Sequence, residues 1–422
     1  MNAFDLTNDE LVAKQVILKL YTQGVAKEFV MTENMKLPQW FDEAKFYRAQ
    51  KFYSQNRLSF FEAGVSGLII LFFSEPLAIK LLKATEKSST PETAKKRYIS
   101  TILHTLSWYE SELKPGSESW KSLEKVRIMH NHASKMGQKL QLGFVVSQKS
   151  VAFTAFGFFG LVLLKSRLLG INNACEEDFE ALIHFWAVIS NLLGVEDEFN
   201  IYLNSSSVVR LVFSIYLRYI VMPMIQLENP DIKLMAKSFV DGFKEYVPTS
   251  YERKLFLLRR LIGIPGYQYN IDLNEERLMC RNIFTNNELA TVKEYYLNHN
   301  FWNIDLIDED FQLLKIESKS SCDSILNPCD EVGHISINDT EQICFRKLQN
   351  QNSWNNSLND SAYRRFNEID QKRIRFGLSI LEKYNCNFIA KFLINFLSDF
   401  MIFKMRKFSG IPTVDIDINE IF

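Results

Sequence analysis

The sequence predicts an all-α protein. Apolar residues recur at intervals of three and four over long segments, and the alternating apolar–polar patterns typical of strands are scarce. Prolines, glycines and short clusters of Ser, Thr and Asp separate these segments, where helices are expected to begin and end. A chain of 422 residues is long enough for one large domain or two ordinary ones.

The N-terminal segments show the helical period first. Residues 1–40 carry a helix-like apolar pattern that breaks at Pro38, and Asp42 is placed to cap the next helix. Residues 58–82 are apolar almost all round, which predicts a central buried helix. Pro76 should interrupt this helix or begin a second one.

Further helices are expected along the middle of the chain. Their approximate bounds are residues 93–109, from 119 into the region of His130, 153–169 ending at Gly170, 176–193 ending at Gly194, 206–225, and 230–263.

The composition changes after about residue 300. Residues 317–342 are polar and residues 349–360 are rich in Asn and Gln, so we expect loops or a linker in both. A last helix is predicted at about 370–407. We therefore divide the chain into an N-terminal helical extension (1–40), a helical domain (41–300) and a C-terminal extension (301–422) with a polar linker at about 317–360.

The last predicted helix is amphipathic. Polar side chains recur on it at helical spacing, with Phe and Ile opposite and with basic residues near its end: Asn387, Lys391, Asn395, Ser398, then Lys404, Arg406 and Lys407. Packing against the main domain is the commoner explanation of such a pattern, and we favour it. The alternative is peripheral contact with a membrane surface.

Composition restricts the class of partner. The net charge is −1 and no basic stripe with interleaved aromatics is present, so we expect no nucleic acid partner. The chain contains 34 Phe, an excess that suits a pocket for a flat or long apolar ligand, although a merely Phe-rich core explains it equally well.

The six cysteines are scattered and form no CxxC pair, which favours a reducing compartment. No signal peptide is expected at the acidic N-terminus. The longest uncharged apolar run, residues 151–164, is shorter than the ~20 residues of a membrane span. We expect an intracellular protein, cytoplasmic or peripheral at the endoplasmic reticulum membrane.

His130 is the strongest candidate for a metal ligand. Only six histidines occur, and His130 and His132 lie on a predicted helix between two apolar segments. Residues two apart on a helix point in different directions, whereas Arg127 and His130 share a face. A neutral imidazole can bind haem iron, and a nearby arginine can pair with a haem propionate. The alternative is an ordinary core histidine.

Arg97 and Thr101 are four apart and share a helix face. A cation and a hydroxyl at one place can position dioxygen or a polar substrate group. Spacing alone favours the simpler alternative, a surface arginine and a threonine bonded to its own helix.

Other catalytic motifs are absent. The sequence has no phosphate-binding glycine loop, no GxSxG elbow and no HExxH pair. Glu62 and Glu75 have the most apolar surroundings among the carboxylates. Either can act as a base with a raised pKa, but an ordinary salt bridge is the more common role.

Four segments taken in order resemble a known family. They are Arg97-Tyr-Ile-Ser-Thr101, Val126-Arg-Ile-Met-His130, Gln148 leading into Phe153-Thr-Ala-Phe-Gly-Phe, and His184-Phe-Trp-Ala-Val-Ile through Leu193-Gly-Val-Glu-Asp-Glu198. Together they resemble the catalytic domain of the latex-clearing protein (rubber oxygenase) family, which includes a fungal endoplasmic-reticulum oxygenase of mycophenolic acid biosynthesis. The resemblance spans about residues 45–260.

This resemblance implies a globin-like helical core with additional helices, and oxidative cleavage of isoprenoid double bonds by dioxygen at haem b. His130 matches the family's proximal iron ligand, and Arg127 matches the arginine of the same motif. Arg97 and Thr101 match the arginine and threonine of the distal helix.

The sequence also departs from the family pattern. Ser100 stands where rubber-cleaving members carry a lysine that can bind iron, so no lysine-capped closed state is expected. Ser134 and Lys135 stand where an arginine often follows the proximal histidine, and no residue is assigned to the distal glutamate.

We therefore hypothesise a haem-dependent oxygenase that acts on an apolar, isoprenoid-like substrate in a Phe-rich channel containing Phe153, Phe156 and Phe158. The alternative is a non-catalytic helical protein that retains the family scaffold and binds haem or lipid without turnover.

Overall fold

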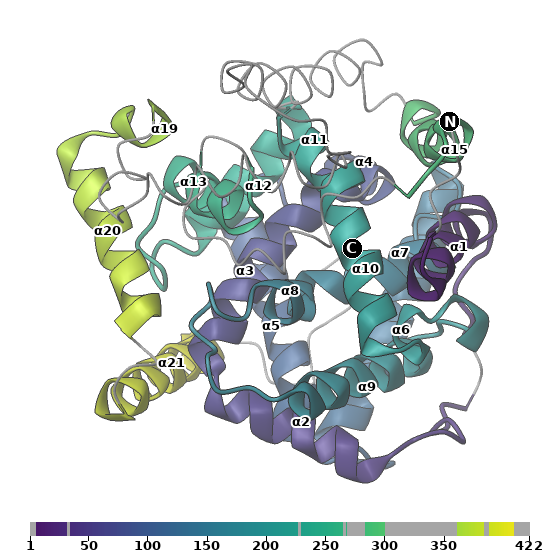
Figure 1. Cartoon of the computed structure of the whole chain (residues 1–422), viewed down its shortest axis with the longest axis horizontal. Helices are drawn as coiled ribbons and strands as arrows, with labels where there is room; N and C mark the ends of the chain where they lie inside the picture. Colours follow the sequence, from purple (N-terminus) through teal and green to yellow (C-terminus); the bar gives the residue numbers. More distant parts are fainter. Residues whose placement is uncertain are drawn as a thin grey trace, which may run out of the picture.

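The described part of the chain is built from helices (Figure 1). The computed structural model describes residues 6–31, 34–226, 229–264, 267, 283–299, 361–383 and 388–408. No strand occurs in these ranges, and the only extended pairing within them is an isolated bridge between Glu28 and Ser147. The all-α prediction is confirmed.

The N-terminal half contains α1 (Asn8–Thr22), η1 (Gly24–Ala26), α2 (Glu43–Gln55), α3 (Arg57–Ser74), α4 (Pro76–Thr85), α5 (Pro91–Glu110), α6 (Glu118–Lys139), α7 (Gln148–Thr154), η2 (Phe156–Gly160), α8 (Leu161–Lys165) and α9 (Glu176–Leu192). The remainder contains η3 (Asp197–Phe199), η4 (Ile201–Leu203), α10 (Ser206–Tyr216), η5 (Leu217–Val221), α11 (Met222–Gln226), α12 (Pro230–Gly242), α13 (Tyr251–Leu261), α15 (Asn286–Leu297), α19 (Ser361–Arg364), α20 (Glu368–Lys383) and α21 (Phe388–Phe408).

Several helix ends follow the predicted chemistry. The side chain of Asp42 accepts a hydrogen bond from the Lys45 amide at the start of α2, and Pro76 occupies the first turn of α4. Gly170 and Gly194 adopt positive φ values of 85° and 100° beyond α8 and α9, which glycine adopts without a steric cost.

Three predicted helices differ from the structure. Residues 230–263 form two helices, α12 and α13, because Pro248 precedes a new N-cap at Ser250. The segment predicted at 153–169 begins earlier, at Gln148, and contains the π-helical turn η2. The terminal helix is divided into α20 and α21, and the four residues between them lie outside the described residues, as do the predicted linkers at 317–342 and 349–360.

Helix α3 lies at the centre of the fold, as its apolar sequence predicts. It packs against η2, α12, α8 and η5, and Gly67 allows its backbone to approach Gly157 of η2 closely. Helix α2 packs on α9, α12 on α5, and α1 on α10 and α15. In Figure 1, α1 and α15 lie at one edge of the molecule, and α20 and α21 lie at the opposite edge.

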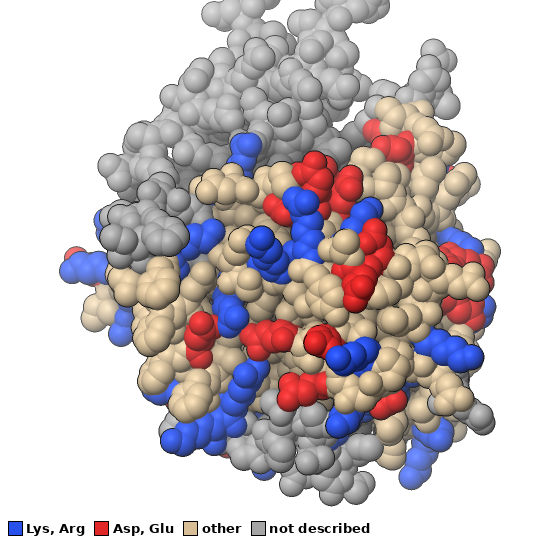
Figure 2. Space-filling model, turned by 90° about the horizontal axis from the view of Figure 1, so that it is seen from below, with Lys and Arg blue, Asp and Glu red and all other residues tan. Residues whose placement is uncertain are grey.

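Among the described residues, two helices are long and apolar enough to cross a membrane by length and composition, Arg57–Ser74 and Ser206–Ile225. Most of each is buried inside the protein, as expected for core helices. The surface shown in Figure 2 carries interspersed acidic and basic side chains.

Candidate haem-binding hairpin

The predicted site residues lie on the antiparallel hairpin of α5 and α6. Near its closed end, His104 Nδ1 is 2.8 Å from Ser122 Oγ, and Trp108 Nε1 donates to the same oxygen at 2.9 Å. Ser119 Oγ donates to the Ser107 carbonyl at 2.7 Å. These bonds fix the register of the two helices, and the same register brings Arg97 close to His130 at the open end.

The imidazole of His130 is held neutral. Burial lowers the pKa of His130 to about 4, with further lowering by the charges of Arg127 and then Arg97. Its Nδ1 is buried and has no hydrogen-bond partner in the described part of the chain. The ring meets Phe29 edge-on, with 6.0 Å between centroids. His132 is exposed, which agrees with the prediction that only one of the two histidines faces the interior.

Arg127 is buried and joins α6 to α9. Its Nη1 donates to the Leu192 carbonyl at 2.5 Å, at the C-terminal end of α9, where backbone carbonyls lack helical partners. Burial lowers its pKa.

Arg97 and Thr101 occupy α5, across from His130 and Arg127. Burial lowers the pKa of Arg97. The hydroxyl of Thr101 donates to the Arg97 carbonyl at 3.2 Å, which is the bond to its own helix that spacing favoured. The charges of Arg97 and Arg127 thus both act on the pKa of His130. The Thr101 hydroxyl donates its proton to the Arg97 carbonyl, so it can only accept a hydrogen bond from a ligand.

His104 is a second neutral imidazole on the hairpin. Burial, with a smaller effect of Lys125, lowers the pKa of His104 to about 4. Its Nε2 is buried and has no hydrogen-bond partner in the described ranges. Ser100 is buried one turn before it.

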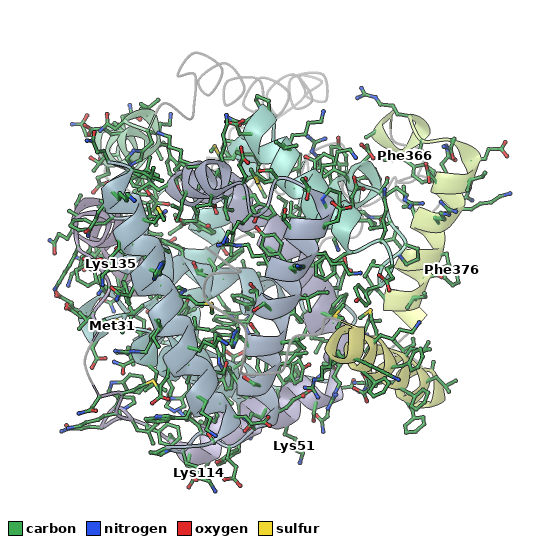
Figure 3. All side chains as sticks on the ribbon, turned by 180° about the vertical axis from the view of Figure 1, so that it is seen from behind. Met31, Lys51, Lys114, Lys135, Phe366 and Phe376 are labelled. Carbon is green, nitrogen blue, oxygen red and sulfur yellow. The ribbon has the colours of Figure 1, made fainter. Side chains whose placement is uncertain are left out.

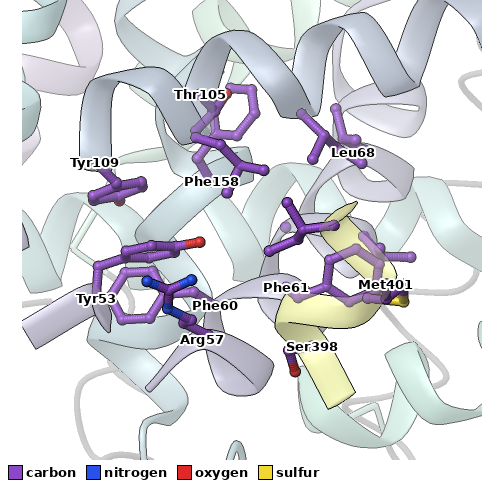
Figure 4. Close-up of a pocket in the computed structure, with 15 residues that line it drawn as sticks. Tyr53, Arg57, Phe60, Phe61, Leu68, Thr105, Tyr109, Phe158, Ser398 and Met401 are labelled. Carbon is purple, nitrogen blue, oxygen red and sulfur yellow. The ribbon is translucent and has the colours of Figure 1, made fainter. Parts of the chain in front are cut away.

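An apolar cavity of about 60 Å³ is lined in part by α5 (Figure 4). It is enclosed by α3, α5 and α21, and Thr105, one turn after Thr101, reaches it. Of the predicted Phe channel, only Phe158 lines this cavity. Phe153 and Phe156 are fully buried in the core, where they pack on Tyr216 at 4.4 and 5.0 Å between centroids. The cavity is smaller than the ~300 Å³ of a typical small-molecule site.

The sequence indicates only one partner of a buried ion pair. Lys149 Nζ lies 2.8 Å from Glu75 Oε1, with both side chains almost completely buried. Four aromatic rings surround the ammonium at centroid distances of 4.7–6.0 Å: Tyr295, Tyr21, Tyr296 and Phe153. The apolar setting of Glu75 identified one partner, but nothing in the local sequence indicates the partner 74 positions away. The salt-bridge interpretation of Glu75 is confirmed, and Glu62 likewise pairs with Lys254.

The described residues thus define an all-α protein with a half-buried, neutral histidine beside two arginines. Residues 50–200 match the family model of the "ER-bound oxygenase mpaB/B'/Rubber oxygenase, catalytic domain". They include Arg97, Thr101, Arg127 and His130, so the resemblance based on their motifs is confirmed. The family is one of oxygenases.

Among solved structures, the chain matches the "Structure of Latex Clearing Protein LCP in the closed state". The sequence identity is 14%, and the match covers 70% of this chain and 91% of that chain. The TM-score is 0.27. The search of curated proteins gave no match.

The hairpin residues fit a haem group chemically. A haem needs only one protein ligand on its proximal side, and a neutral imidazole with an unsatisfied buried nitrogen is a suitable one. Two arginines beside it suit the propionates. No group of three or more His, Cys, Asp or Glu that could hold a metal ion occurs in the described ranges, but haem iron does not require one.

Proposed function

We propose that this protein is a haem b-dependent oxygenase that oxidises or cleaves an apolar, isoprenoid-like substrate with dioxygen. The observation that carries the proposal is the half-buried, neutral imidazole of His130 beside Arg127 and Arg97, whose buried Nδ1 has no hydrogen-bond partner in the described residues. It lies within the residues that match a family of oxygenases.

Each hairpin residue has a role that follows from its chemistry. His130 offers a lone pair at neutral pH, because its low pKa keeps the ring unprotonated. Arg127 and Arg97 supply fixed positive charge for carboxylates of the cofactor or for a polar substrate group. Thr101 offers its oxygen as an acceptor, since its proton is bound to the Arg97 carbonyl. Haem b, when bound, supplies an iron centre that activates dioxygen.

A second candidate function is a non-catalytic haem- or lipid-binding protein. Two observations favour it: Ser100 provides no amine near the distal position, and the hydroxyl of Thr101 is directed to its own helix. The small volume of the apolar cavity beside α5 also suits a short ligand segment better than a whole substrate.

The substrate class suggests the location. An apolar isoprenoid resides in membranes, so we place the protein in the cytoplasm or at the periphery of the endoplasmic reticulum membrane, with α21 as the contacting helix. Cys175 is an exposed free thiol, which is compatible with a reducing compartment.

The test is the absorbance spectrum of the protein reconstituted with haem. We expect His130→Ala to abolish the Soret band, because the ring supplies the iron ligand. The matched control is His132→Ala on the exposed side of the same helix, which should retain full haem occupancy. A His130→Ala protein that keeps its Soret band would remove the assignment.

Turnover then separates the two functions. Haem-loaded protein is incubated with polyprenyl compounds and dioxygen, and new aldehyde and ketone ends are measured. Products from wild type that are lost in His130→Ala support the oxygenase. Full haem binding without products supports the non-catalytic candidate.

A further inference from the structure

Helix α21 is fixed to the body of the protein through one face only. Lys391 Nζ donates to Asn56 Oδ1 at 3.2 Å, and the Asn395 side chain donates to the Gln55 carbonyl at 3.4 Å. Further along the same face, Ser398, Ile402 and Met405 are buried. The prediction that this helix packs against the main domain is therefore confirmed for its polar face.

Charged groups add a second attachment. Arg57 pairs with Asp399 of α21 and lies 3.4 Å from Glu110, whose other oxygen accepts from Arg406 of α21 at 2.7 Å. This chain of four charges joins the start of α3, the end of α5 and two turns of α21. These ion pairs and the buried side chains of Ile402 and Met405 hold the inner face of the helix, and its Phe and Leu side chains on the opposite face take no part.

The apolar face of α21 points away from the body. In the described part of the chain, every large apolar side chain that is at least half exposed lies on α20 or α21. These eight residues are Ile369 (63%), Phe376 (67%), Phe392 (65%), Leu393 (53%), Phe396 (62%), Leu397 (62%), Phe400 (50%) and Phe403 (57%). Figure 3 shows Phe376 at the outer edge of the molecule. Six of the eight lie on α21, and an exposed apolar face of this size marks an interaction surface.

Cations border this face. Lys404 Nζ lies 5.0 Å from the centre of the Phe400 ring, and Lys407 Nζ lies 6.0 Å from that of Phe403. On α20, Lys372, Arg373 and Arg375 are exposed. Two acids of these helices are paired, Asp399 with Arg57 and Asp370 with Arg253, while Glu368 is exposed at the start of α20.

We propose that this surface of α20 and α21 docks on an anionic lipid bilayer. Exposed Phe and Leu with adjacent Lys and Arg are the features of a helix that lies in a membrane interface, where the rings enter the headgroup region and the cations meet lipid phosphates. Lysine is depleted in protein–protein interfaces, so the same composition argues against a second copy of the chain as the occupant.

The surface also identifies the source of the substrate, and this step rests on the proposed function. The inner face of α21 contributes Ser398, Met401 and Ile402 to the wall of the apolar cavity (Figure 4). Docking would therefore place the cavity about one helix diameter, ~10 Å, from the lipid. A hydrocarbon chain can then pass from the bilayer to α5 without crossing water, which points to a membrane-dissolved substrate.

The test is co-sedimentation of the full chain with vesicles of phosphatidylcholine alone or mixed with phosphatidylserine. We expect binding to the mixed vesicles, and the triple variant Phe392→Ser/Phe396→Ser/Phe400→Ser should lower it at least about tenfold. Leu234→Ser, at an exposed apolar position (46%) on α12, is the matched control and should bind as wild type does. Lys404→Glu/Lys407→Glu should weaken binding about tenfold or more on the mixed vesicles only.

Three results would overturn the proposal. Wild type fails to sediment with the mixed vesicles, the triple variant sediments as well as wild type, or the triple variant instead converts an oligomer into a monomer by light scattering. Thermal melting of each variant checks folding, which exposed substitutions should leave unchanged. The haem assignment is judged separately, because His130→Ala should still bind vesicles and the triple variant should keep its Soret band.

Discussion

At the scale of single residues, the hairpin shows how burial sets protonation. His104 and His130 face different neighbours, a serine hydroxyl and a pair of arginines, yet burial is the largest cause of the low pKa in both. Each ring is therefore neutral at physiological pH, which is the state that a ligand to iron requires.

These pKa values predict how stability depends on pH. A histidine whose pKa is lowered from 6.5 to about 4 in the folded protein binds its proton more readily when unfolded. Above pH ~6.5 the ring is neutral in both states, and His130 takes nothing from the free energy of unfolding. As the pH falls toward ~4, the unfolded chain binds the proton first, and this lowers the free energy of unfolding by about 3 kcal/mol for such a shift. We expect His130→Gln, measured by urea unfolding without haem, to reduce the loss of stability of wild type across this range.

His132→Gln provides the comparison, because this exposed residue shares the helix. It should leave the pH profile of wild type unchanged. An identical slope in wild type and His130→Gln would show that the ring of His130 does not titrate as its burial requires.

At the scale of elements, two glycines of α3 have opposite surroundings. A Cβ added to Gly67 would lie 1.9 Å from the Gly157 carbonyl oxygen, so the contact between α3 and η2 depends on the absence of a side chain. A Cβ added to Gly64 meets nothing within 4 Å, because this residue faces the apolar cavity.

This contrast gives a paired prediction for unfolding free energies. Gly67→Ala should destabilise the protein by about 1–3 kcal/mol, since backbone and not a flexible side chain must move. Gly64→Ala should stabilise it by about 0.5–1 kcal/mol through helix propensity. Equal effects of the two variants in denaturant unfolding would contradict the close packing of α3 on η2.

The sequence predicts most helices and several of their ends, but not every boundary or every contact between helices. Periodicity with Asp42, Pro76 and Gly194 locates helices and their ends, because these signals are local. The break between α12 and α13 was missed, since the apolar pattern continues while the backbone turns. The motifs placed His130 and Arg97 on facing helices, but the spacing of residues cannot show that Arg127 bonds the end of α9 or that a cavity lies beside α5.

At the scale of the whole molecule, the Glu75–Lys149 pair joins segments that are distant in the chain. Glu75 lies between α3 and α4 and Lys149 on α7, while the surrounding rings come from α1, α15 and α7 itself. The hydroxyls of Tyr21 and Tyr296 are 2.6 Å apart, and Tyr296 also donates to the Ser74 carbonyl at 3.3 Å. The ion pair and its rings thus connect the N-terminal helix and α15 to the core.

The buried charges of Glu75 and Lys149 stabilise the fold only when both are present. Burial raises the pKa of Glu75 and lowers that of Lys149, and each partner opposes the shift of the other. Removing one partner leaves an uncompensated buried charge, at a cost of about 3–5 kcal/mol. We therefore expect Lys149→Met to lower the free energy of unfolding by about this amount, and Glu75→Gln/Lys149→Met to lower it by less, because no charge remains. Urea unfolding of the two single variants and the double variant measures the coupling, and strictly additive losses would show that the two groups do not act as one unit in the core.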